Sequence, residues 1–349
     1  MSAEHKNLKD TVADISEFIK KEHPEMWRKQ LDQIPSEVFD EYLATKKDCS
    51  QNTIAAYKSR VEKAFRCAAA TYKNGDFEAF QYINTPLSNR TEDLRNVSIG
   101  RDLLNIALKH MDPNSGGFKG NKIASLFGAR IFEIEKLEVR DINFKDNTLT
   151  IRKGKGNKTR VIKMTDNQAA IMANMVKDMK PSQRIAGCGQ DAIQKSLIRA
   201  LERIDKKYET NTATQLTDKK TNTHAIRKLV ATEQYNKNLN YEKYKYILSK
   251  LETDYLKTKE AGITKEILEK YKVDITKIDE NKLATFCRKN FNDLENTIEN
   301  KDIRMLEHTA WSPVSEMLGH GPNRWELKDV YVVNDSTKII NIDINLLFQ

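Results

Sequence analysis

One short segment, residues 147–164, interrupts a chain whose apolar residues otherwise recur mostly at helical spacing. Two β-rich runs, NTLTI and TRVIKM, flank the linker RKGKGNK, and small residues between β-branched runs predict a hairpin. Amphipathic helical patterns cover 9–20, 36–46, 50–73, 93–111, 120–137, 166–179, 190–207 and 222–235. We therefore expect a mainly α protein with a small β-sheet.

The same patterns divide the chain into two regions. Residues 1–90 are expected to form a small helical domain, and the polar, proline-containing segment 84–93 to act as a linker. Residues 91–349 are expected to form the second domain. Within it, 236–308 is a charged helical stretch that we interpret as an insertion, and 334–349 is a tail with apolar residues that a neighbouring subunit could accept.

Composition narrows the class of protein. The chain carries 59 basic and 50 acidic residues, so its net charge of +9 permits a polyanionic partner. No run approaches the roughly 18 apolar residues that a membrane span needs, and the N-terminus lacks the apolar region of a secretory signal. Four scattered cysteines without a C-x-x-C pair fit a reducing compartment. We expect a protein of the cell interior, in the cytoplasm or with the nucleoid, with a virus or plasmid as a candidate source.

The predicted hairpin concentrates positive charge. Residues 151–163 contain six basic residues and no acidic one, and Gly154 and Gly156 stand at the bend. Clustered cations without carboxylates suit a phosphodiester backbone, although a solvated lysine-rich turn is the alternative. The predicted DNA contacts are Arg152, Lys153, Lys158 and Arg160.

Elsewhere the chain offers residue types that suit a phosphate. Arg130 follows a small-residue turn and opens an apolar helical run, where its guanidinium could grip two phosphate oxygens. His224 and Arg227 share one helix face at i and i+3. His320 stands between two glycines, and Tyr331 follows it by 11 residues.

The order of these motifs resembles that of the tyrosine recombinases, which include phage-type integrases and Xer-like enzymes. GARIFEIEKLEV resembles their first-arginine box, and GKGNKTRVI resembles their hairpin lysine, which would be Lys155. THAIRKLVAT resembles the His-x-x-Arg box, VSEMLGH the second histidine box, and SQNTIAAYKSRVEKAF the first helix of the core-binding domain. His320 follows Arg227 by 93 residues, a gap much longer than is usual in the family, hence the interpretation of 236–308 as an insertion.

The resemblance implies a helical, DNA-clamping core-binding domain and a catalytic domain that cleaves and rejoins double-stranded DNA at a specific site. Tyr331 would attack the phosphorus and form a 3′-phosphotyrosyl link, while His224 accepts its proton. Arg130, Arg227 and His320 would stabilise the charge of the transition state, and Lys155 would protonate the leaving 5′-oxygen. The resemblance implies no cofactor, metal or ATP, and a dimer or tetramer on the DNA.

Several alternatives stay open. Lys153 or Lys158 could replace Lys155, and His308 could replace His320. Rival nucleophiles are Tyr235, Tyr241, Tyr244 and Tyr246. The LGHGPN motif and the long interval before Tyr331 are also similar to telomere resolvases, which form hairpin DNA ends by the same chemistry. The remaining alternatives are a type IB topoisomerase and a non-catalytic DNA-binding protein on a recombinase-like scaffold.

Overall fold

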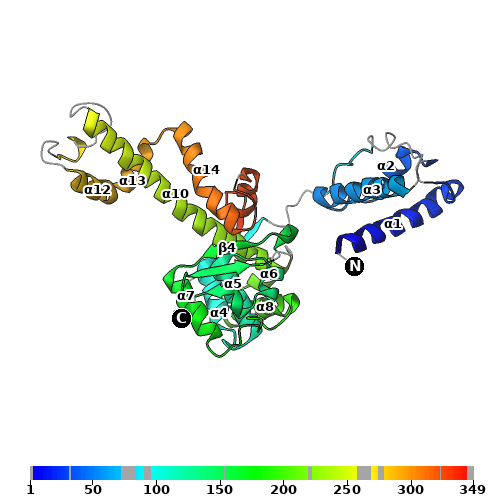
Figure 1. The fold of residues 1–349 in the computed structure, drawn as a ribbon, viewed down its shortest axis with the longest axis horizontal. Helices are drawn as coiled ribbons and strands as arrows, with labels where there is room; N and C mark the ends of the chain where they lie inside the picture. The colour runs from blue at the N-terminus through cyan, green and yellow to red at the C-terminus, as the bar shows by residue number, and fades with distance from the viewer. Residues whose placement is uncertain are drawn as a thin grey trace. The chain divides into compact units, whose positions relative to one another are not determined.

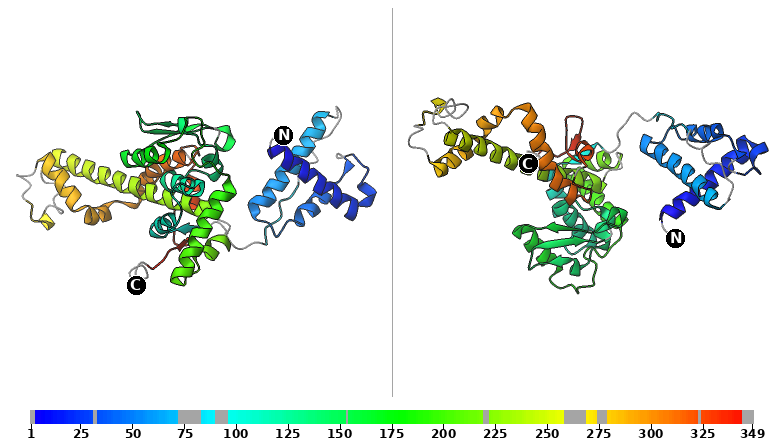
Figure 2. Two further views of the ribbon diagram at one scale, coloured as in Figure 1. Left: turned by 90° about the horizontal axis from the view of Figure 1, so that it is seen from below. Right: turned by 45° about the horizontal axis from the view of Figure 1, so that its top comes forward.

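The chain folds into two compact units, Met1–Asp93 and Leu94–Gln349, each of which has its own core. The computed structural model describes residues 3–30, 33–71, 83–89, 96–152, 154–218, 222–257, 269–273, 279–322 and 324–343. Figures 1 and 2 show helices throughout both units and short strands in the second, which confirms the expected mainly α architecture with a small sheet.

The first unit is a small helical domain. Its elements are α1 (Ala3–Glu22), the 3₁₀ helix η1 (Pro24–Met26), α2 (Ser36–Ala44) and α3 (Gln51–Thr71). Phe39 and Phe65 meet edge to face, with ring centroids 4.8 Å apart, and are buried with aliphatic residues from all three helices. This cluster gives the unit an apolar core that does not depend on the rest of the chain.

The second unit begins with a strand and a compact set of helices. Its first part contains β1 (Val97–Ile99), α4 (Arg101–Lys109), α5 (Gly116–Phe127), α6 (Ile131–Lys136), η4 (Val139–Asp141), α7 (Asp166–Val176), α8 (Gln190–Tyr208) and α9 (Thr212–Asp218). Helices α5 and α8 pack against each other at the centre of the largest apolar cluster. The single helix expected over 120–137 is two helices, because Gly128 adopts a left-handed conformation and ends α5.

The predicted hairpin is present. Strands β3 (Thr148–Ile151) and β4 (Arg160–Lys163) pair antiparallel, and β2 (Ile142–Asn143) extends them to a three-stranded sheet. The 3₁₀ turn η5 (Lys155–Asn157) joins β3 to β4, and Gly156 within it has a φ of +74°. Glycine suits this turn because other residues rarely adopt such a backbone.

A helical arm projects from the second unit (Figure 1). It consists of the far part of α10 (Asn222–Lys257), then α12 (Glu280–Lys289), α13 (Phe291–Leu294), η7 (Glu295–Thr297) and α14 (Asn300–Met317). Its own buried cluster includes Ile247, Leu251, Leu283 and Leu306. The charged stretch 236–308 therefore forms a packed substructure on two long helices, apart from residues 258–268 and 274–278, which lie outside the described part.

After the arm, the chain returns to the main body of the second unit. The last elements are η8 (Trp325–Leu327), α15 (Lys328–Tyr331) and β5 (Lys338–Ile340). Strand β5 pairs in parallel with β1, and Ile340 and Ile342 join the largest apolar cluster. The expectation that a neighbouring subunit takes up the tail is therefore corrected for residues 338–342, which dock on their own unit. Residues 344–349 of the tail lie outside the described part.

Candidate active site

Arg130 is held at the start of α6 by the residue three positions later. Its backbone N–H donates to Glu133 Oε2 at 2.9 Å, which is the reciprocal half of a capping box. Its Nη2 lies 3.1 Å from Nε2 of His320. Because a guanidinium only donates, this imidazole nitrogen accepts and the His320 proton belongs on Nδ1.

His224 and Arg227 lie on one face at the beginning of α10, as predicted from their spacing. Arg227 is only 2% exposed, and its Nη1 and Nη2 donate to the carbonyl oxygens of Gly128 and Leu318, both at 2.5 Å. Burial lowers the pKa of Arg227 to about 10, and the positive charge of Arg130 acts in the same direction. The side chain therefore remains a cation at neutral pH, and its hydrogen bond to Gly128 fixes it against the turn that precedes Arg130.

Tyr331 lies among these residues. Its ring centroid is 5.0 Å from the Arg227 guanidinium carbon, 5.4 Å from the His224 ring centroid and 5.3 Å from the His320 ring centroid. The tyrosine is 9% exposed. The structure thus brings together Arg130, His224, Arg227, His320 and Tyr331, although His320 and Tyr331 follow the long arm in the sequence.

The packing around Tyr331 explains its position. Trp311 and Val314 of α14 and Tyr235 of α10 belong to the same buried cluster as the tyrosine. Two residues after the tyrosine, the Val333 N–H donates to Oγ1 of Thr232 in α10 at 2.9 Å. Contacts from both long helices therefore fix the backbone that carries the phenol.

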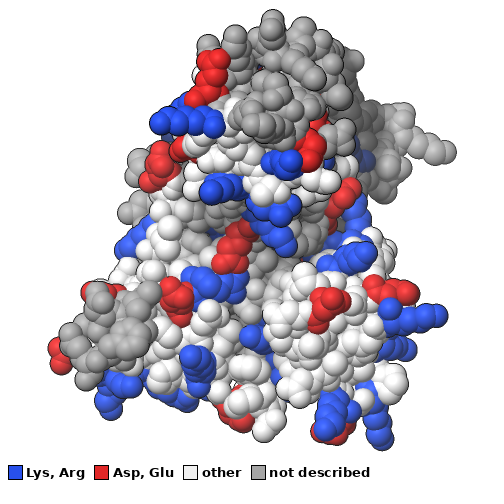
Figure 3. All heavy atoms as spheres, turned by 90° about the vertical axis from the view of Figure 1, so that its left-hand side faces the viewer, with Lys and Arg blue, Asp and Glu red and all other residues white. Residues whose placement is uncertain are grey.

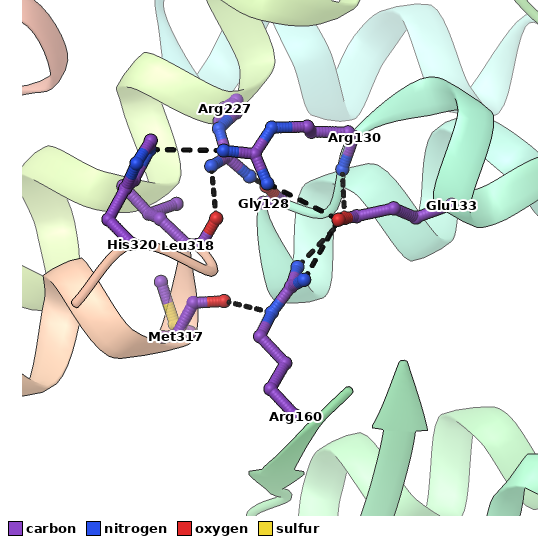
Figure 4. A network of polar contacts seen from close by, with 8 residues as sticks. All are labelled: Gly128, Arg130, Glu133, Arg160, Arg227, Met317, Leu318 and His320. Atoms are coloured by element: carbon purple, nitrogen blue, oxygen red, sulfur yellow. Dashed lines mark hydrogen bonds and ion pairs between the residues drawn. The ribbon is translucent and has the colours of Figure 1, made fainter. Parts of the chain in front are cut away.

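Glu133 forms the negative centre of this site (Figure 4). Its buried carboxylate accepts one hydrogen bond from each terminal nitrogen of Arg160, both at 2.8 Å, and one from Arg130 Nη1 at 3.3 Å. Burial by itself would raise the pKa of Glu133, but the hydrogen bonds and charge of Arg160, aided by Arg130, outweigh it and lower the pKa. Glu133 is therefore an ionised anchor for two arginines.

Arg160 was predicted to contact DNA, and its position corrects that expectation. Its side chain is 12% exposed and turned inward to Glu133, so it is not available to reach a phosphate backbone. The residue pattern of β4 carries the missed signal. Side chains alternate across a strand, so Arg160 shares a face with the buried Ile162, while Val161 is exposed.

The other predicted hairpin cations are placed differently. Lys158 is exposed, and Arg152 is largely exposed and forms an ion pair with Asp141. Lys153 lies outside the described residues. For Lys155 the structure describes the backbone, at the start of the turn η5, but not the side chain.

The alternative tyrosines and the alternative histidine either lie away from the candidate active site or pack behind it. Tyr241 is exposed, and Tyr244 and Tyr246 pack against the core of the arm. Tyr235 is buried in the cluster behind Tyr331 and meets Trp311 edge to face. His308 stacks on Trp325 with ring centroids 3.8 Å apart.

A cleft of about 590 Å³ adjoins the site between the hairpin, α10 and α14. His320 and Arg160 contribute to its wall, together with Lys158, Lys163 and Lys237. Among the described residues, no group of three or more metal-ligating side chains could hold an ion, and none of the helices is long and apolar enough to cross a bilayer.

Two guanidinium groups and two imidazoles thus converge beside a phenol. In a water-poor site, such fixed donors stabilise negative charge that develops on an oxygen, and removing one typically costs about 10²–10³ in rate. A tyrosine in contact with an imidazole has a base available for its proton. The arrangement suits nucleophilic attack on a phosphodiester.

We compared the chain with known proteins and solved structures. Two solved structures resemble the chain slightly: XerA recombinase, at 14% identity over 65% of this chain and 75% of that one with a TM-score of 0.29, and an integrase from mycobacterium phage Brujita, at 14% identity over 69% and 76% with a TM-score of 0.26. No curated protein matches. Residues 121–249, which contain Arg130, His224 and Arg227, match the phage integrase family. This match confirms, over these residues, the predicted resemblance to the tyrosine recombinases.

Proposed function

We propose that this protein is a site-specific DNA recombinase that breaks and rejoins double-stranded DNA through a phosphotyrosyl bond on Tyr331. The observation that carries the proposal is the packing of the Tyr331 ring against Arg227, His224 and His320. These residues come from elements up to 107 positions apart in the sequence. A protein that only bound DNA would have no need to assemble them around a phenol.

In the proposed reaction the Tyr331 oxygen forms a bond to phosphorus as the bond from phosphorus to the 5′-oxygen breaks. His224 takes the phenolic proton, and Lys155 gives a proton to the departing 5′-oxygen. Arg130, held beside Glu133, and the buried Arg227 stabilise the charge on the non-bridging oxygens, with His320 as a further hydrogen-bonding group. Because the covalent bond conserves the phosphodiester energy, a 5′-hydroxyl can reverse the step without ATP.

The DNA-binding surface in this proposal is the hairpin together with the first unit. Lys158, Lys163 and Lys237 line the cleft beside His320, where phosphate groups would approach the site. The helical unit 1–93 would clamp the duplex from outside the catalytic unit, and a dimer or tetramer would assemble on a paired site.

The decisive experiment is covalent capture. A library of random-sequence duplexes, each with a nick that lets the cleaved fragment leave, is incubated with the protein and separated on a denaturing gel. We expect wild-type protein to be trapped on a subset of sequences, and peptide mapping to place the DNA on Tyr331. The variant Tyr331→Phe should bind the captured sequences with unchanged affinity but form no adduct.

A matched control is Tyr241→Phe, which removes the same hydroxyl from an exposed tyrosine of the arm. This variant should form the adduct as wild type does. Adduct formation by Tyr331→Phe would move the nucleophile to another residue. The absence of any wild-type adduct with any sequence would favour the non-catalytic DNA-binding alternative, and adducts with every sequence would favour the topoisomerase.

A second candidate is telomere resolution, favoured by the 11-residue interval between His320 and Tyr331. Its chemistry is the same, but each cleaved strand is joined to the opposite strand of the same duplex. Incubation of a captured target built as a palindrome, followed by a denaturing gel, distinguishes the two. Hairpin products indicate a resolvase, and exchanged strands of unchanged polarity indicate a recombinase.

A further inference from the structure

Arg160 extends from strand β4 of the hairpin into the wall of the candidate site. Its two terminal nitrogens donate to the two oxygens of Glu133, and its Nε donates to the carbonyl oxygen of Met317 at 2.9 Å. The guanidinium thus bonds to two other segments at once, namely the start of α6 and the end of α14 (Figure 4).

Two glycines leave the space that this guanidinium occupies. A Cβ at Gly319, beside His320, would lie 2.6 Å from Arg160 Nη1. A Cβ at Gly154, in the hairpin, would lie 3.1 Å from the same nitrogen and 3.0 Å from Glu133 Oε1. The hairpin backbone and the turn before His320 therefore both approach the ion pair closely.

These contacts join three segments that each carry a residue of the proposed reaction. The hairpin carries Lys155, Arg130 directly precedes α6, and α14 leads into His320. A lysine at position 160 would keep the charge but could not make the paired bonds to Glu133 together with the bond to Met317, because it lacks the planar fork of donors.

We propose that Arg160 is a positioning residue that fixes the hairpin against Arg130 and His320, so that the proton donor of the hairpin meets the leaving oxygen. This inference rests on the proposed function. Its role differs from contact with DNA, because only 12% of the side chain is exposed and its donors are directed to protein oxygens.

The leaving group provides a specific test. When the bond from phosphorus to the 5′-oxygen breaks, the oxygen needs a proton from the hairpin. When sulfur replaces that oxygen, the thiolate departs without a proton because a thiol is far more acidic than an alcohol. A displaced hairpin should therefore slow cleavage of the oxygen substrate much more than cleavage of the 5′-phosphorothiolate.

The experiment compares single-turnover cleavage by wild type and Arg160→Lys on a captured target with oxygen or sulfur at the scissile position. We expect the variant to cleave the oxygen substrate about 100-fold more slowly, the cost typical of a misplacement near 1 Å, with DNA affinity within about threefold of wild type. With sulfur, its rate should return to within about tenfold of wild type. An equal loss on both substrates, or no loss on the oxygen substrate, would overturn the positioning role.

Further variants separate positioning from general damage. Gly154→Ala crowds the same ion pair without removing a charge, and it should show the same preferential recovery with sulfur. If Arg160→Lys fails to fold, Gly154→Ala becomes the deciding variant. If Gly154→Ala then loses the same fraction of the wild-type rate on the oxygen and the sulfur substrate, the positioning role is overturned.

The matched controls are Gly189→Ala, where the nearest atom to the new Cβ lies at 3.7 Å, and Arg140→Lys in an exposed ion pair. Both should cleave as wild type does, and a sulfur-specific recovery in either would contradict the assignment to Arg160. If the wild-type protein cleaves neither substrate, the proposed function itself is overturned. If the wild type cleaves and Arg160→Lys cleaves equally fast, only the positioning role is overturned.

Discussion

At the scale of single residues, the site consists of buried charged side chains held in place by hydrogen bonds and ion pairs. Arg227 is surrounded by protein, and its two terminal nitrogens donate to carbonyl oxygens in the turns next to Arg130 and His320. The same guanidinium lies against the Tyr331 ring. Arg227 therefore connects the first-arginine motif, which contains Arg130, with the second histidine motif, which contains His320, both by hydrogen bonds and by its charge.

Replacement of this residue by lysine should separate charge from geometry. A lysine keeps the charge but cannot hold both carbonyls in the same plane, so we expect Arg227→Lys to lower the single-turnover cleavage rate about 10²-fold. Arg199→Lys, at an exposed position of α8, is the matched control and should leave the rate unchanged. Wild-type rates for Arg227→Lys would show that only the charge matters.

Glu133 predicts a pH dependence of stability. Its folded pKa lies below the ordinary value of 4.5, so the ion pair contributes stability that is fully present above pH 4.5 and is lost as the pH falls through the lowered pKa. Glu133→Gln should cost about 3 kcal/mol at neutral pH, because it leaves Arg160 buried without its counter-charge. Urea titrations from pH 7 to pH 3 measure this difference.

The difference between wild type and Glu133→Gln should shrink as the pH falls below 4.5, because Glu133 then binds a proton in the unfolded chain while it is still ionised in the folded protein. A difference that stays constant down to pH 3 would contradict the assignment of a lowered pKa to this group. Glu316→Gln on the cleft surface offers a carboxylate control outside the ion pair.

At the scale of elements, two helices serve both the arm and the site. Helix α10 begins with His224 and Arg227 and continues into the arm, and α14 leads back from the arm to His320. The gap that separates the histidine motifs in the sequence is thus spanned by helices that pack against each other. In Figure 3, acidic and basic side chains are interspersed over the described part of the face that is shown.

The arm has a separate core, and this predicts local rather than global destabilisation. Leu283→Ala removes a side chain that is 1% exposed and should cost about 2–5 kcal/mol within the arm. Hydrogen exchange should then quicken over 239–251 and 281–306 while 222–232 stays protected. Trp311→Ala, in the cluster around Tyr331, is the contrasting variant and should expose the site itself. Loss of protection at 222–232 in Leu283→Ala would show one cooperative core instead.

The sequence was sufficient for much of this architecture, and its limits have physical reasons. The hairpin and the face shared by His224 and Arg227 follow from local periodicity, which depends on neighbouring residues. The contact of Tyr331 with α10 could be expected only through the family resemblance. The role of Arg160 was missed because charge is visible in a sequence, whereas burial against a carboxylate 27 positions away is not.

At the scale of the whole molecule, each of the two units has its own core, and this predicts that they can be separated. A chain of residues 94–349 should unfold cooperatively and still form the covalent adduct at raised protein concentration. Its affinity for a captured target should fall at least about tenfold, because the proposed clamp and its phosphate contacts are gone. Fluorescence anisotropy at two salt concentrations measures this loss.

The isolated unit 1–93 is the companion in this test. It should fold on its own, because its buried aromatic cluster is complete within these residues. Failure of 94–349 to fold while 1–93 folds would indicate that the catalytic unit depends on the first one. Unchanged affinity of 94–349 would remove the clamp from the proposed function.

The parallel pairing of β5 with β1 has a consequence for cleaved DNA in the proposed reaction. Tyr331 lies on a span that Trp311 anchors upstream, through its bond to the Arg324 carbonyl, and that β5 anchors downstream. A DNA end attached to this tyrosine would be tethered to backbone fastened on both sides. That end would therefore keep its place beside the arginines of the site until a 5′-hydroxyl returns to reseal the strand.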